Sequence, residues 1–128
     1  MNPIPTRWRT TFEEQLADAG RRLELATRHL GEGEGGRALQ DAYPAVVAAA
    51  TVRVWLDQPP WVRPLPGPEL QRKTKDAFPS LFAAIAALDL RDVLSSPWQV
   101  EAVRPYLSEA ETFVQETRER LAACLAQN

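Results

Sequence analysis

The segment from Ala45 to Leu56 is the part of this chain that most constrains its fold. Its sequence, AVVAAATVRVWL, is apolar on almost every side of a helix, and only Thr51 and Arg53 interrupt the run. A helix without a polar face has to be covered by neighbours all round. Because its alanines are small, we expect those neighbours to approach closely. We therefore predict that this segment is the buried axis of a helical bundle.

Apolar residues recur with helical spacing before this segment as well. From Trp8 to Leu30 they are three or four positions apart, which is typical of an amphipathic helix and not of a strand. A capping box at Thr10 or Thr11 would mark its start. The run Gly31–Gly36 should form a flexible turn, because glycine disfavours helix. The second helix then covers about residues 37–56.

Prolines divide the rest of the chain. Pro44 predicts a kink or a restart in the second helix, because proline removes a backbone hydrogen bond and crowds the preceding turn. The segment 57–68 holds five of the 11 prolines and should be a stiff, extended crossover. A third helix is expected at 69–87, with Pro79 inside it, and a short turn or helix at 89–94. The last helix should begin with Ser96 as its N-cap, with Pro105 bending or splitting its first turn.

These elements predict an all-α fold, namely a four-helix up-down bundle with a kinked central helix and a Pro-rich crossover loop. We expect a single domain spanning residues 1–128, and no sheet, because no segment of useful length alternates with period two. The composition agrees with this, since 45% of residues are hydrophobic and 25% are charged, as in globular domains. A domain of this size needs neither disulfides nor metals to fold.

Charge and composition also limit the partners. A net charge of -2 argues against a dedicated nucleic-acid binder, which usually carries a basic excess. Cys124 is the only cysteine, so no internal disulfide can form. The N-terminal sequence lacks the apolar core of a secretory signal, and the longest apolar run, Ala45–Ala50, is too short to cross a bilayer. We therefore expect a cytoplasmic protein with no membrane partner.

Residues that could carry catalysis are few. His29 is the only histidine, and Arg22 lies seven residues before it, so both would share a helix face. Such a pair could serve a metal-independent ribonuclease, with histidine as acid and base and arginine on the phosphate. The favoured interpretation is that His29 complements the dipole at the end of its helix. We assign no catalytic residue, no metal site and no cofactor, because one histidine and one distant cysteine make a poor ligand set.

The candidate binding residues are Trp61 and Arg63 of the proline-rich segment together with Tyr43 and Arg53 of the second helix. Large apolar side chains on a loop, such as Trp61, either cover the bundle core or form a surface for a partner. A third alternative is a small-ligand pocket between the helices, capped by Trp61 and opened by internal prolines whose missing hydrogen bonds free backbone carbonyls.

The segment Ala38–Leu56 resembles the second helix of HEPN domains, with the pattern A-x3-AY-x-A-x2-AA after a glycine-containing turn. The resemblance implies a bundle that dimerises, as in toxin–antitoxin, CRISPR and other defence systems. HEPN members include ribonucleases and partners of nucleotidyltransferases. The ribonucleases carry Arg-x4-6-His in a late helix, but neither Arg91 nor Arg104 here is followed by histidine.

The resemblance therefore implies a non-catalytic interaction protein, acting as a homodimer with a protein or nucleotide partner, such as a nucleotidyltransferase. RNA is a further partner that the basic clusters would allow, namely Arg72, Lys73 and Lys75, Arg7 and Arg9, and Arg21, Arg22 and Arg28, although nearby acidic residues argue against it. The alternatives are a ribonuclease that uses Arg22 and His29, and a small-ligand-binding bundle.

Overall fold

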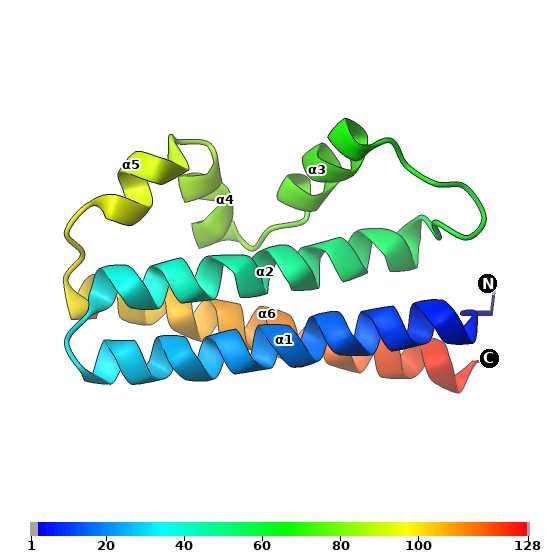
Figure 1. Cartoon of the computed structure of the whole chain (residues 1–128), viewed down its shortest axis with the longest axis horizontal. Helices are drawn as coiled ribbons and strands as arrows, with labels where there is room; N and C mark the ends of the chain where they lie inside the picture. Colours follow the sequence, from blue (N-terminus) through cyan, green and yellow to red (C-terminus); the bar gives the residue numbers. More distant parts are fainter. Residues whose placement is uncertain (1–2, 128) are drawn as a thin grey trace.

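The protein is all-helical, as its sequence predicts. The computed structural model describes residues 3–127, and within them it has six helices and no strand. The helices are α1 (Thr6–Gly31), α2 (Gly35–Asp57), α3 (Gly67–Asp76), α4 (Ser80–Ala86), α5 (Leu90–Ser95) and α6 (Val100–Ala126). The four-helix up-down bundle is not confirmed, because three long helices pack together and three short ones form a layer of their own (Figure 1).

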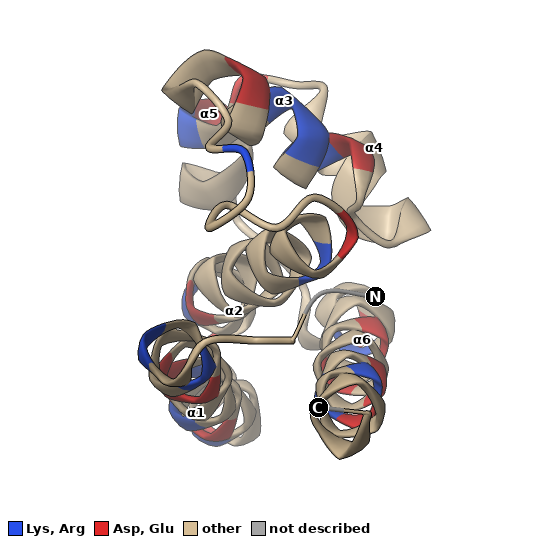
Figure 2. Cartoon of the chain, turned by 90° about the vertical axis from the view of Figure 1, so that its right-hand side faces the viewer, with Lys and Arg blue, Asp and Glu red and all other residues tan. Residues whose placement is uncertain are grey.

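Helix α2 is the central element. In the end-on view it lies between the pair α1 and α6 on one side and the short helices α3, α4 and α5 on the other (Figure 2). Helix α1 runs antiparallel to α2, whereas α6 runs parallel to it (Figure 1). The side chains of α2 that are completely inaccessible to solvent include Ala45, Val46, Ala49, Ala50 and Val52. The predicted buried axis is therefore confirmed.

Prolines inside the long helices do not interrupt them. Helix α2 continues through Pro44 and α6 continues through Pro105, so a restart at Pro44 and a split first turn at Pro105 were wrong predictions. An internal proline costs about 3 kcal/mol of helix stability. Both helices bury many apolar side chains along their whole length, and this packing outweighs the local cost.

Pro79, in contrast, divides the predicted third helix in two. Helix α3 ends at Asp76, and Pro79 adopts an extended conformation (φ -67°, ψ 159°) just before α4 begins. Proline disfavours helical geometry in the residue before it. Thr74 is the one buried residue of α3, so little burial compensates here for a continuous helix.

The turn between α1 and α2 is shorter than the glycine run predicts. Only Glu32–Glu34 lie outside the helices, so most of the glycines of the run are helical. Gly33 has a φ of +81°, a conformation that residues with a side chain rarely adopt. Helix α1 also begins earlier than predicted, at Thr6, and no capping box forms at Thr10 or Thr11.

The last helix starts later than predicted, at Val100 rather than after Ser96. The hydroxyl of Ser96 donates to the Asp92 carbonyl (2.5 Å), and the indole Nε1 of Trp98 donates to the Val93 carbonyl (2.7 Å). These bonds satisfy carbonyls at the end of α5. Ser96 therefore closes the helix before it instead of capping the helix after it.

The proline-rich crossover covers one end of the bundle. Trp61 packs into a cluster with Trp8, Phe12 and Trp55, whose ring centroids lie 5.4–6.1 Å apart. The buried indole Nε1 atoms of Trp8 and Trp61 have no hydrogen-bond partner among residues 3–127. Apolar and ring contacts therefore hold this aromatic cluster together.

We predict that Trp61→Ala lowers the free energy of unfolding by about 3 kcal/mol, at the lower end of the cost of deleting a packed tryptophan. The matched control is Val62→Ala in the same loop, because Val62 is 60% exposed and its truncation should change stability by less than about 0.5 kcal/mol. Urea denaturation of both variants measures the difference. Equal stabilities would show that the crossover does not cover the core.

Candidate functional site

Arg22 and His29 are not brought together. Arg22 Nε donates to Asp18 Oδ2 (2.9 Å) on the solvent face of α1. His29 Nδ1 lies 2.5 Å from Asp41 Oδ2 of α2, and both of these side chains are mostly buried. Each group has its own acidic partner, and the His29–Asp41 pair links the end of α1 to α2. The arrangement favours a structural role for both residues.

Arg53 links α2 to α6. Its Nε donates to the Thr117 hydroxyl (2.7 Å), its Nη2 donates to the Phe113 carbonyl (3.1 Å), and its guanidinium lies 3.9 Å from the centroid of the Phe113 ring. Burial lowers the pKa of Arg53 from its usual value, against the opposing effect of Glu116 at 3.6 Å. The predicted binding residue Arg53 is therefore occupied by contacts within the bundle.

The other predicted binding residues lie apart from one another. Trp61 belongs to the aromatic cluster, and Arg63 is an exposed residue of the crossover. Tyr43 lies far from this cluster. It is separated along α2 from Trp55, the α2 member of the aromatic cluster, by about 18 Å, because each helical residue adds 1.5 Å. Of the four residues, Tyr43 lines a cavity between α2 and the short helices.

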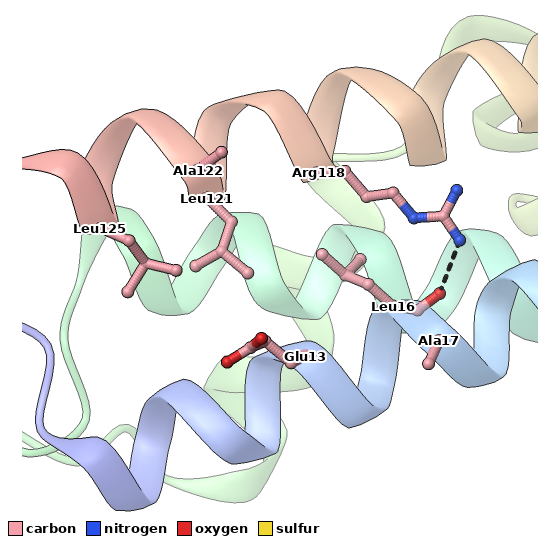
Figure 3. Close-up of a pocket in the computed structure, with 7 residues that line it drawn as sticks. All are labelled: Glu13, Leu16, Ala17, Arg118, Leu121, Ala122 and Leu125. Carbon is pink, nitrogen blue, oxygen red and sulfur yellow. Dashed lines mark hydrogen bonds between the residues drawn. The ribbon is translucent and has the colours of Figure 1, made fainter.

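A second cavity, of about 380 Å³, follows the contact between α1 and α6 (Figure 3). Arg118 Nη2 crosses it and donates to the Leu16 carbonyl (3.1 Å). A Cβ atom at Gly20 would lie 2.4 Å from the same nitrogen, so glycine makes room for this contact. Leu16 and Leu121 are already buried, and this groove exposes less apolar surface than the cavity beside Tyr43.

The cavity beside Tyr43 is a better candidate for a ligand site. It has about 350 Å³ of space, which is at the lower end of the range for small-molecule pockets. Its lining comes from α2, α3, the α3–α4 turn and the start of α5, and consists of Tyr43, Val47, Thr51, Leu70, Gln71, Thr74, Lys75, Phe78 and Leu90. We call it the α2–α3 pocket.

Four polar side chains of the α2–α3 pocket have no hydrogen-bond or ion-pair partner among residues 3–127, namely Tyr43, Gln71, Thr74 and Lys75. Thr74 is the most unusual, because it is only 5% exposed. Four other helical threonines donate to the carbonyl one turn earlier, at 2.7–3.1 Å: Thr11, Thr27, Thr51 and Thr117. The Thr74 hydroxyl is still reached by solvent, because the side-chain polar atoms buried without a partner among residues 3–127 are the indole nitrogens of Trp8 and Trp61.

Tyr43 forms part of the inner wall of the pocket. Its ring is 9% exposed and packs edge-to-face on Phe78, with centroids 5.7 Å apart. Burial raises the pKa of the Tyr43 phenol above its usual value of 10.0. The hydroxyl therefore stays protonated at neutral pH and can donate a hydrogen bond into the pocket.

The local sequence explains how α3 presents polar groups to α2. Leu70, Thr74 and Phe78 are four residues apart and follow one face from α3 into the turn after it, and this face packs on α2. The middle member of this stripe is polar although its neighbours are apolar. Sequence reasoning identified Lys75 only as a member of a basic cluster and missed Thr74 and Gln71. A threonine within the apolar stripe is the signal that could have identified this site.

No model of a known protein family, no curated protein and no solved structure matches this chain. Within residues 3–127, no helix is long and apolar enough to span a membrane, and no three potential metal ligands lie close together.

We predict that Thr74→Val changes the free energy of unfolding by less than about 0.5 kcal/mol, because the Thr74 hydroxyl has no partner among residues 3–127. Thr117→Val is the control and should cost about 1–3 kcal/mol. Thr117 is also buried and helical, but its hydroxyl accepts from Arg53 and donates to Phe113. Chemical denaturation compares the two, and a large loss in Thr74→Val would show that its hydroxyl has a partner within the fold.

The raised pKa of Tyr43 predicts a pH dependence of stability. Below pH 10 the phenol is neutral in both the folded and the unfolded chain, so it adds no slope. Above pH 10 the unfolded chain loses this proton first, so stability falls as pH rises. The free energy of unfolding of the wild type should therefore fall more steeply above pH 10 than that of Tyr43→Phe. If the free energies of unfolding of the wild type and Tyr43→Phe fall with the same slope in this range, the prediction is wrong.

Proposed function

We propose that this protein is a non-catalytic binding module that holds a small amphipathic molecule in the α2–α3 pocket. The lining of this pocket is the observation that carries the proposal, because it places the polar side chains of Tyr43, Thr74 and Lys75, which have no hydrogen-bond or ion-pair partner among residues 3–127, beside apolar walls. These groups are free to bond to a ligand that enters the pocket.

The apolar part of the lining supports the same function. Val47, Leu70 and Phe78 supply aliphatic and aromatic surface, and a few polar side chains interrupt it. Small-molecule sites usually combine these features, with apolar walls that provide affinity and a few polar groups that fix orientation.

A binding role is favoured over catalysis by the titratable groups of the pocket. Tyr43 is a protonated phenol at neutral pH, because its ordinary pKa of 10.0 lies well above 7 and burial raises the pKa further, so it is a hydrogen-bond donor rather than a base. His29 pairs with Asp41, and neither lines the pocket. These observations support a site that holds a molecule without transforming it.

The proposal is tested by thermal denaturation of the full chain with a panel of small aromatic and aliphatic acids, amides, amines and nucleotides. The panel includes nucleotides because the HEPN resemblance implies a nucleotide or protein partner. A compound that binds only the folded protein raises its melting temperature. We expect at least one amphipathic compound to do so in the wild type.

Val47→Phe should abolish that stabilisation, because the larger ring fills part of the pocket from its α2 wall. Leu88→Phe is the control, since Leu88 is 61% exposed and does not line the pocket. A panel without any stabilising compound, or equal stabilisation of Val47→Phe and wild type, would overturn the proposed function.

A further inference from the structure

The polar residues of the α2–α3 pocket form one edge on α3. Gln71, Thr74 and Lys75 are three and four positions apart, so they share a face of this helix. Thr74 is buried, whereas Gln71 and Lys75 are exposed and lie at the rim. The apolar side chains Val47, Phe78 and Leu90 complete the lining from other elements. A ligand that contacts both the polar edge on α3 and the apolar lining has an apolar body and one polar end.

The charge of that polar end follows from the lining. Lys75 is the one charged residue among the pocket residues, and no carboxylate lines the cavity. Its ammonium group has no ion-pair partner among the described residues. The other polar groups can all donate hydrogen bonds: the Tyr43 phenol, the Gln71 amide and the Thr74 hydroxyl. This set suits an acceptor with one negative charge and disfavours a cation.

A carboxylate fits these groups better than a phosphate. Phosphate sites usually add arginine forks or free backbone amides at a helix N-terminus to a lysine. The α3 residues that line the pocket are Leu70, Gln71, Thr74 and Lys75. Their backbone amides are bonded within the helix, and no arginine lines the cavity. One ammonium group beside neutral donors matches a single carboxylate.

We infer that the ligand of the α2–α3 pocket is an amphipathic monocarboxylate, in which a compact aromatic or branched aliphatic body lies against the apolar wall and the carboxylate meets Lys75 and Thr74. This inference rests on the proposed function of the pocket. Lys75 is the residue that selects the charge of the ligand, and the Thr74 hydroxyl donates a hydrogen bond to the same carboxylate.

The test compares matched probes in titrations of the ¹⁵N-labelled full chain at pH 7, followed by NMR. The probes are phenylacetate and 4-methylpentanoate, the neutral phenylacetamide, the cation 2-phenylethylammonium, and adenosine monophosphate. We expect phenylacetate to bind about five- to tenfold more tightly than phenylacetamide, because a hydrogen bond to a charged group is the stronger one. The largest shifts should fall on Gln71, Thr74 and Lys75, and the ammonium probe should bind most weakly.

Two variants separate the selective role of Lys75 from a general effect of positive charge. Lys75→Gln should reduce phenylacetate affinity to that of the amide and leave amide affinity unchanged. Lys73→Gln is the matched control, because Lys73 also lies in the last turn of α3 but does not line the pocket, and it should keep the preference for the carboxylate.

The outcomes distinguish this inference from the proposed function. If phenylacetamide or adenosine monophosphate binds at Thr74 as tightly as phenylacetate, or if Lys75→Gln keeps the carboxylate preference, the ligand class is wrong while the pocket remains a binding site. If no probe shifts the pocket residues, the ligand class is overturned together with the binding of such compounds in the α2–α3 pocket.

Discussion

The burial of α2 on two opposite sides is the constraint on which the rest of the structure depends. A helix that is apolar all round is stable in water only when neighbours cover each of its faces. Helices α1 and α6 cover one side, and α3, α4 and α5 cover the other (Figure 2). The same burial keeps α2 continuous through Pro44, because the packed side chains before and after the proline hold the helix together.

The two covering layers differ in how much they bury, and the pocket lies in the weaker one. Helices α1 and α6 contribute long apolar stripes, whereas α3 buries Thr74 and α5 buries no residue. Regions with few buried contacts open locally at low free energy, and binding sites are often found there. The α2–α3 pocket is thus a place where incomplete covering of α2 leaves space and an unpartnered hydroxyl.

The helices and the central axis could be predicted from sequence, because periodicity and composition are local properties. Whether a helix continues through a proline could not be predicted from sequence. Both Pro44 and Pro79 remove a backbone hydrogen bond, but α2 continues through Pro44, whereas Pro79 separates α3 from α4. Burial by distant residues decides between them. For the same reason the sequence identified Arg53 and Trp61 as unusual without showing that the bundle itself engages them, and it did not identify Thr74.

Native-state hydrogen exchange, recorded with and without a carboxylate ligand, tests most directly the claim that α2 is a rigid axis with a weaker, ligand-binding layer on one side. We expect the amides of α2 to exchange only through global unfolding and the amides of α3 to exchange faster through local opening, and we expect the ligand to slow exchange in α3 selectively. Equal protection of α2 and α3 without ligand, and no change in α3 on its addition, would contradict this claim.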